Sequence, residues 1–102
     1  MSNLTANQRL CKQPAEKRKF SMEFAALLST SEVITTVSSI TSEEINGDTS
    51  DLIISGQNIN GSKVEMFIES GTSGKTYRVE ITVSTNGGQI LQGDGILYVS
   101  DK

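Results

Sequence analysis

The segment Gly71–Thr76 carries the pattern closest to a known chemical motif, because its Gly-Lys-Thr matches the end of a phosphate-binding loop. That loop requires another glycine five positions before the glycine of Gly-Lys. Glu69 occupies this position, and its negative charge would repel a phosphate. The loop must also open a helix, whereas Tyr77–Val83 alternates apolar and polar residues as a strand does. The pattern therefore predicts a glycine-containing turn between two strands.

Few other residues are candidates for catalysis or metal binding. The chain contains no histidine, so its single cysteine, Cys11, lacks the base that would activate a thiol nucleophile. Glu43 and Glu44 are adjacent but lie in a polar stretch, without the desolvation that acid–base catalysis exploits. Asp48 and Asp51 leave a weak surface calcium site as an alternative, although the spacing of an EF-hand loop is absent. We expect no catalytic, cofactor-binding or metal-binding residues, and hence no enzyme.

Positive charge gathers at the N-terminus of an otherwise acidic chain. This asymmetry is typical of a segment that binds an acidic partner, and a solvated arm without a partner is the alternative. Nucleic acid is disfavoured, because the acidic remainder would repel phosphates and no aromatic residue stands among the basic ones. Phe67 joins the candidates because it lies on the polar face of its strand. The predicted partner-binding residues are Arg9, Lys12, Lys17, Arg18, Lys19 and Phe67.

Hydropathy argues against a membrane protein. No stretch approaches the roughly 18 apolar residues that a membrane span requires, and the N-terminus lacks the apolar run of a secretory signal. The single cysteine also excludes a disulfide within the chain. We therefore expect a protein made in a cytoplasm, with no membrane partner.

Apolar residues recur at every second position in several segments, as in strands with one buried face. The expected strands are 9–12, 19–24, 33–40, 52–55, 63–69, 77–83 and 90–99, with a short helical turn at 24–28. Gly93 and Gly95 in the last strand indicate a bulge or a close backbone approach. About seven short strands separated by turn signals predict an all-β, immunoglobulin-like antiparallel β-sandwich. Residues 1–15 are expected to form a flexible basic arm, and residues 16–102 the sandwich.

Tyr77 is expected to have a structural role. In immunoglobulin-like sandwiches a tyrosine near the start of the sixth strand hydrogen-bonds to upstream backbone, two residues before a core position. The sequence places Gly74 before Tyr77 and Val79 at that core position. We predict that Tyr77 forms this corner and that Val79 lies in the core. The Asn-Gly-Gly run that ends in Gly87 and Gly88 predicts a hairpin, because such a turn needs positive φ.

Two parts of the sequence carry a family resemblance. The first joins Arg9–Lys12, Pro14–Glu16 and Phe20–Phe24 to Val33–Ser38, and the second runs from Val64 through Gly71–Val79 and Val83–Gly88 to Val99. Together they resemble the small immunoglobulin-like virion proteins of tailed bacteriophages that are labelled fiber–tail adaptors or neck and tail accessory proteins. Members of that family usually carry a tryptophan near Phe24–Leu28, and this chain has none.

The resemblance implies a structural component of a tailed bacteriophage particle, without enzyme activity or cofactors. It implies an adaptor that bridges neighbouring virion proteins, namely portal, head-completion or connector, tail or fiber subunits, in multiple copies around a ring. Such a protein is assembled in the host cytoplasm and resides in the virion. The alternative is an immunoglobulin-like decoration on the virion surface that binds a receptor or a carbohydrate, with Phe67 and Tyr98 as its exposed aromatic candidates.

Overall fold

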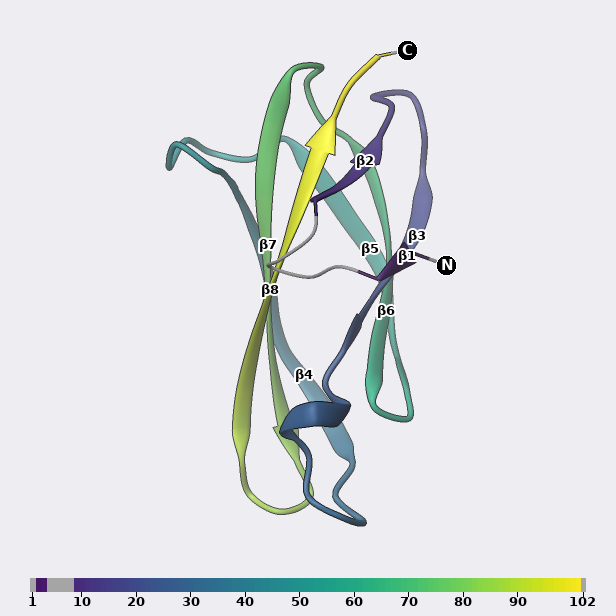
Figure 1. Cartoon of the computed structure of the whole chain (residues 1–102), viewed down its shortest axis with the longest axis vertical. Coiled ribbons are helices and arrows are strands. Elements are labelled where there is room, and N and C mark those ends of the chain that lie inside the picture. The colour runs from purple at the N-terminus through teal and green to yellow at the C-terminus, as the bar shows by residue number, and fades with distance from the viewer. Residues whose placement is uncertain (1, 4–8, 102) are drawn as a thin grey trace.

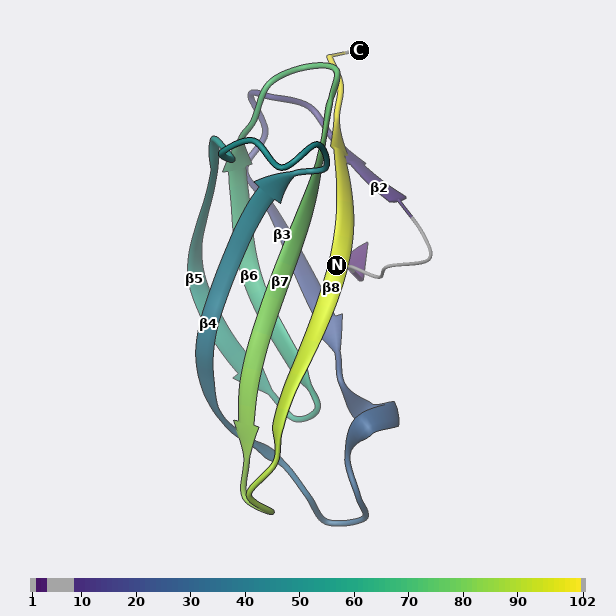
Figure 2. The ribbon, with the colours of Figure 1, turned by 90° about the vertical axis from the view of Figure 1, so that its left-hand side faces the viewer.

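The computed structural model describes residues 2–3 and 9–101, which form a β-sandwich of two four-stranded sheets (Figures 1 and 2). The first sheet contains, in spatial order, β1 (Ser2–Asn3), β3 (Arg18–Glu23), β6 (Lys63–Ser70) and β5 (Leu52–Asn60). The second contains β2 (Arg9–Lys12), β8 (Ile90–Val99), β7 (Lys75–Thr85) and β4 (Ile34–Glu44). A 3-10 helix, η1 (Ala25–Leu27), follows β3. The predicted all-β sandwich is confirmed.

The two sheets have a strand order that is known from other sandwiches. The orders β1-β3-β6-β5 and β2-β8-β7-β4 correspond to A-B-E-D and C-F-G of immunoglobulin constant-type domains, with β2 as an added edge strand. β1 differs from the antiparallel pattern, because it pairs with β3 in parallel. The immunoglobulin-like assignment stays a prediction that this order supports. At three residues η1 is far too short to cross a bilayer, and the described residues offer no other helix that could.

Alternating burial along the strands builds the core. Successive side chains of a strand point to opposite faces, so every second residue of β6 and β7 faces the other sheet. The fully buried residues of these two strands are Val64, Met66, Ile68, Tyr77, Val79, Ile81 and Val83. Phe20 and Met22 of β3 and Leu97 of β8 extend the same core. The period-two burial that the sequence predicts is thus confirmed in β3, β6 and β7.

Gly93 lets β3 and β8 approach closely near η1. A Cβ added at Gly93 would lie 2.6 Å from Met22 Sδ and 3.2 Å from two ring carbons of Phe24. β7 and β8 pair without a register shift from Lys75 opposite Val99 to Ser84 opposite Ile90. The sequence left a bulge and a close backbone approach as alternatives for Gly93. The close approach is confirmed, and the pairing of β7 with β8 has no bulge there.

The N-terminal segment predicted as a free arm contributes to the sandwich. Arg9–Lys12 form β2, which pairs in parallel with Ile96–Val99 of β8. The backbone N–H of Ser100 donates a hydrogen bond to the carbonyl of Lys12 at 2.9 Å. The boundary expected at residue 15 therefore does not coincide with an edge of the described sandwich, because both β1 and β2 precede it. Residues 4–8 of the predicted arm lie outside the described residues.

β4 and β5 are longer than predicted, because β4 continues through the polar residues 41–44 and β5 continues through a bulge after Ser55. Register shifts interrupt β4 between Ile34 and Thr36 and again between Val37 and Ser39, where the strand pairs with β7. β5 was expected to end before Gly56, but it runs to Asn60 with a register shift between Ser55 and Asn58. An extra residue at a bulge moves the next inward side chain along by one position. A strict period of two therefore cannot detect these strands at full length.

Replacement of Gly93 by alanine tests the close approach. We expect Gly93→Ala to lower the free energy of unfolding by about 1–3 kcal/mol, because the added methyl group must displace Met22 and Phe24. Asp94→Ala, at the exposed next position, should change it by no more than about 0.5 kcal/mol. Urea unfolding followed by circular dichroism gives both values. Equal stabilities for the two variants would contradict the contact.

Candidate functional site

Phe67 lies on the outer face of the first sheet. Its neighbours in β6, Met66 and Ile68, point into the core, so Phe67 points away from it and remains 36% exposed. The pairing of the strands places Lys19 of β3 on one side of Phe67 and Ser55 of β5 on the other. The prediction that Phe67 stands on the polar face is therefore confirmed.

Two lysines from the start of β3 and the preceding turn surround the Phe67 ring. The Nζ atom of Lys17 is 5.5 Å from the ring centroid, and that of Lys19 is 5.9 Å from it. An ammonium group at this distance is attracted by the negative face of the ring. The ring also packs against Gly56, where an added Cβ would lie 3.2 Å from Phe67 Cδ2. We name Lys17, Lys19 and Phe67 the basic–aromatic surface.

Glu65 holds Lys19 in this position. The Glu65 carboxylate is 3.5 Å from Lys19 Nζ and accepts hydrogen bonds from the side-chain amides of Asn60, at 3.1 Å, and Asn58, at 3.4 Å. The hydrogen bond from Asn60 is the largest of the effects that lower the pKa of Glu65 below its usual value. Glu65 therefore stays ionised at neutral pH and helps to keep Lys19 beside Phe67. The sequence did not single out Glu65, because only the pairing of β3 with β6 brings it near Lys19.

The other predicted partner-binding residues lie elsewhere. Lys12 is 2% exposed, and its Nζ donates hydrogen bonds to the carbonyls of Gln13, at 2.7 Å, and Pro14, at 3.4 Å. Burial is the main cause that lowers the pKa of Lys12 below its usual value. This burial does not fit the prediction that Lys12 contacts a partner. Arg18 is exposed and donates to the carbonyl of Cys11 at 3.3 Å, while Arg9 lies in β2 opposite Ile96.

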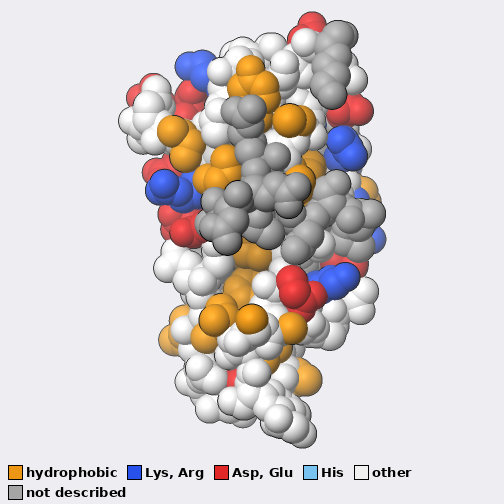
Figure 3. Space-filling view, viewed as in Figure 1, with side chains coloured by type: hydrophobic (Ala, Val, Ile, Leu, Met, Phe, Trp, Pro, Cys, Tyr) orange, Lys and Arg blue, Asp and Glu red, His pale blue; other side chains and the backbone are white. Residues whose placement is uncertain are grey.

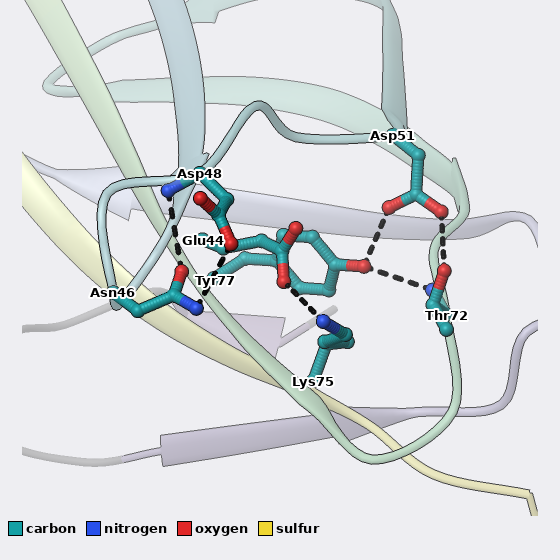
Figure 4. Close-up of polar contacts among 7 residues, drawn as sticks. All are labelled: Glu44, Asn46, Asp48, Asp51, Thr72, Lys75 and Tyr77. Atoms are coloured by element: carbon teal, nitrogen blue, oxygen red, sulfur yellow. Dashed lines mark hydrogen bonds and ion pairs between the residues drawn. The ribbon is translucent and has the colours of Figure 1, made fainter.

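Tyr77 connects the start of β7 to two segments on the opposite side of the sandwich (Figure 4). Its hydroxyl accepts a hydrogen bond from the backbone N–H of Thr72 at 2.8 Å and donates one to Asp51 Oδ1 at 2.5 Å. The hydroxyl of Thr72 donates to the other carboxylate oxygen of Asp51 at 2.6 Å. Tyr77 and Val79 are both fully buried. The hydrogen bond to upstream backbone has the geometry of the predicted corner, and Asp51 completes it.

Asp51 is held ionised by this corner. Hydrogen bonds from Thr72 first and Tyr77 next lower the pKa of Asp51 below its ordinary value of 3.8. Burial is the main cause that raises the pKa of Tyr77. Both carboxylate oxygens of Asp51 therefore serve the packing of the fold.

The remaining motifs of this end of the sandwich also have structural partners. Lys75, the lysine of Gly-Lys-Thr, forms an ion pair with Glu44 at 3.0 Å (Figure 4). Asp48 accepts a hydrogen bond from the Asn46 amide at 3.0 Å. Across residues 2–3 and 9–101, no three His, Cys, Asp or Glu side chains are grouped as metal ligands would be. The turn thus ends at Gly74, and Lys75, the first residue of β7, binds a carboxylate in place of a phosphate.

The three predicted structural glycines lie in turns. Gly88 has a φ of +83°, as the hairpin prediction requires, and Gly74 has a φ of +89°, whereas Gly87 is not among the glycines with positive φ. Gly87 has another reason to be glycine, because an added Cβ would lie 2.6 Å from Glu32 Oε2.

A protein-family model described as podophage GP4 fiber-tail adaptor protein gp77 matches residues 12–98. The chain belongs to this family. No curated protein matches the chain. Membership confirms the resemblance found in the sequence and gives the protein a structural role as an adaptor of phage fiber and tail. The adaptor is accordingly a virion component that binds other virion proteins.

Removal of the Tyr77 hydroxyl tests the corner. We expect Tyr77→Phe to lower the free energy of unfolding by about 1–3 kcal/mol, because Asp51 loses a donor and the N–H of Thr72 loses its acceptor. The losses in Tyr77→Phe and Asp51→Ala should not add in the double variant, because both remove the hydrogen bond between the Tyr77 hydroxyl and Asp51. Chemical unfolding of the natural chain, the two single variants and the double variant gives the four free energies of this double-mutant cycle. Strict additivity, or an unchanged stability of Tyr77→Phe, would contradict the corner.

Acid should remove the contribution of Asp51. Because the folded state lowers the pKa of Asp51, its carboxylate adds stability that is complete above the ordinary value of 3.8 and is lost as the pH falls through the lowered value. The difference in unfolding free energy between the natural chain and Asp51→Asn should therefore be constant above about pH 5 and shrink in stronger acid. Unfolding titrations across this pH range measure the difference, and Asp94→Asn, outside the corner, is the control. A difference that grows on acidification would contradict the assignment.

Proposed function

We propose that this adaptor bridges neighbouring virion proteins at the neck, the tail or the fiber base, and that the basic–aromatic surface is one of its docking surfaces. Its partners under this proposal are portal, head-completion or connector, tail or fiber subunits. Several copies act together around a ring, after assembly in the host cytoplasm. Family membership supports the structural role, and the chemistry of the surface supports the way in which a partner is held.

The observation that carries this proposal is the placement of positive charge around an exposed aromatic ring. Elsewhere in the described chain, Lys75 pairs with Glu44 at 3.0 Å and Arg78 with Glu43 at 3.4 Å. Lys17 and Lys19 are exposed and lie over Phe67, where Lys19 also pairs with Glu65 at 3.5 Å. An acidic segment can pair with these exposed ammonium groups, which the Phe67 ring holds together at the surface. Complementary charge of this kind raises the rate and the selectivity of binding.

The proposed partner is an acidic protein segment and no nucleic acid. The chain has a formal net charge of -3, so a polyanion would meet repulsion from the rest of the adaptor. A short acidic segment avoids this repulsion, because it contacts the basic–aromatic surface alone.

A non-catalytic role fits the partners of the cysteine and of the carboxylates in the chain. The sequence offers no histidine, and Cys11 is exposed in β2 with Arg18 bonded to its backbone carbonyl. The carboxylates of Asp51, Glu32 and Glu65 accept hydrogen bonds that serve the fold. We therefore assign no reaction to the adaptor.

A carbohydrate-binding decoration is less well supported. Phe67, at 36%, is the most exposed aromatic residue of the described chain, and a sugar would need a free face of its ring. Lys17 and Lys19 lie over this ring, and Tyr98 is less exposed than Phe67. Glycan-array binding that disappears in Phe67→Ala would favour the decoration over the adaptor.

Charge reversal tests the docking surface. The double variant Lys17→Glu/Lys19→Glu should fold but reach roughly a tenth or less of the natural incorporation into phage particles, because it repels an acidic partner. Lys63→Glu, an exposed lysine further along the same sheet, is the matched control and should be incorporated normally. Quantitative mass spectrometry of purified particles gives the copy number. Normal incorporation of the double variant would refute the role of this surface.

Binding at this surface should also weaken with salt. Ionic strength screens exposed charges, so the natural chain should dissociate from particles more readily at high salt, while the double variant loses this dependence. Sedimentation of particles at two salt concentrations separates the two behaviours. Equal salt responses would leave no role for the two lysines.

A further inference from the structure

One end of the sandwich is nearly free of charge. η1, the segment 28–33 and the turn between β7 and β8 lie together at the bottom of Figure 1. Within residues 24–33 and 82–92 the sole charged residue is Glu32, although 21% of the whole chain is charged. We name residues 24–33 and 82–92 the charge-poor end.

Large apolar side chains are exposed at this end. Ile90 is 74% exposed, Leu27 is 51% exposed and Val33 is 47% exposed. Figure 3 shows the lower part of the molecule as mostly orange and white, with blue and red concentrated above it. Depletion of charge, rather than hydrophobicity alone, distinguishes the centre of protein interfaces from the rest of a surface. The charge-poor end has both properties.

The one charge of this end is occupied within the fold. Glu32 accepts hydrogen bonds from the backbone N–H of Ser29 at 2.9 Å and from the amide of Gln89 at 2.8 and 3.0 Å. The hydroxyl of Thr85 donates a further hydrogen bond to the same carboxylate. Glu32 thereby joins the segment 28–33 to the β7–β8 turn and does not depend on a cation from a partner.

The exposed apolar residues are held in place before any partner arrives. The backbone N–H of Val33 donates to Asn86 Oδ1 at 3.0 Å, and the backbone N–H of Asn86 donates to the Val33 carbonyl at 3.1 Å. These reciprocal bonds join residues that are 53 positions apart. A surface that is already ordered loses less entropy on binding.

We propose that the charge-poor end is a second docking surface, which binds an apolar, uncharged surface of a neighbouring virion protein by burying Leu27, Val33 and Ile90. This inference rests on the proposed bridging function, because a bridge needs two separate surfaces. A charged partner group would bind poorly, because it would lose its water against the charge-poor end. The residues of this end include no lysine or arginine, and their single carboxylate, Glu32, already has its hydrogen bonds within the fold. The two surfaces therefore select partners by opposite chemistry, one by charge and one by its absence.

A second copy of this chain and a carbohydrate fit the charge-poor end less well. A symmetric contact would bury two Glu32 carboxylates with no positive side chain in residues 24–33 or 82–92 to offset them, and a head-to-tail contact would set this end against the charged remainder of a second copy. A sugar would lack an aromatic platform, because Phe24, the one aromatic residue of this end, is 1% exposed. A different virion subunit is therefore the occupant.

Particles assembled without this chain provide the test, with purified adaptor variants added back and the bound adaptor quantified after sedimentation. Ile90→Asp and Leu27→Asp should each reduce retention roughly tenfold or more, at low and high salt alike. Ile45→Asp is the matched control, because Ile45 is a comparably exposed isoleucine, at 49%, in the turn after β4, where its backbone N–H is bonded to Thr76 of β7 and it lies away from both surfaces. It should be retained like the natural chain. Circular dichroism verifies the fold of each variant, and Ile90→Ser decides if Ile90→Asp unfolds.

The outcomes separate this inference from the proposed function. The second docking surface would be overturned, and the first kept, by one pair of results. Folded Ile90→Asp and Leu27→Asp would bind the particles as well as the natural chain does, while Lys17→Glu/Lys19→Glu would not bind them. If all three variants bind the particles as well as the natural chain does, both docking surfaces are overturned. Analytical ultracentrifugation of the isolated adaptor should show a monomer, and a dimer that Ile90→Asp disrupts would overturn the choice of occupant.

Discussion

The contact between the inner faces of the two sheets is the constraint on which the rest of the structure depends. With no tryptophan and three phenylalanines in the chain, this contact relies on aliphatic side chains and on Phe20 and Phe24. Gly93 permits the approach of β3 to β8, and the Tyr77 corner closes the opposite end with Asp51 and Thr72. Because a small domain buries a limited area, each of these contacts is a large part of its stability. The third phenylalanine, Phe67, stays outside and marks a surface.

Strands that keep a strict alternation could be predicted from the sequence, and those with bulges could not be predicted at full length. β6 and β7 follow the pattern, so the alternation alone indicates which of their residues are buried. In β4 the inward residues Ile34, Val37 and Ile40 stand three positions apart, because two register shifts separate them. β5 passes through Gly56 at a bulge, where a glycine otherwise indicates a strand end. The exceptions thus come from pairing with a neighbouring strand, which local periodicity does not contain.

The candidate surfaces depended on long-range pairing in the same way. The sequence identified Lys17, Lys19 and Phe67 as separate candidates, and the alignment of β3 with β6 makes them one surface. It could not foresee that Lys12, from the same basic segment, turns inward to backbone carbonyls. The charge-poor end likewise depends on the pairing of β4 with β7, which brings Val33 beside Asn86. Residue type therefore indicates what a surface can bind, and topology decides which residues share it.

The bulges in β4 and β5 have a consequence for a protein that functions inside a large particle. These strands form one edge of each sheet, and a straight free edge recruits any extended polypeptide through its backbone. Displaced residues break the regular row of donors and acceptors on which such recruitment relies. Newly made adaptors are thereby discouraged from polymerising into fibrils while they accumulate. Recognition is left to side chains, which can tell the correct neighbour from other chains.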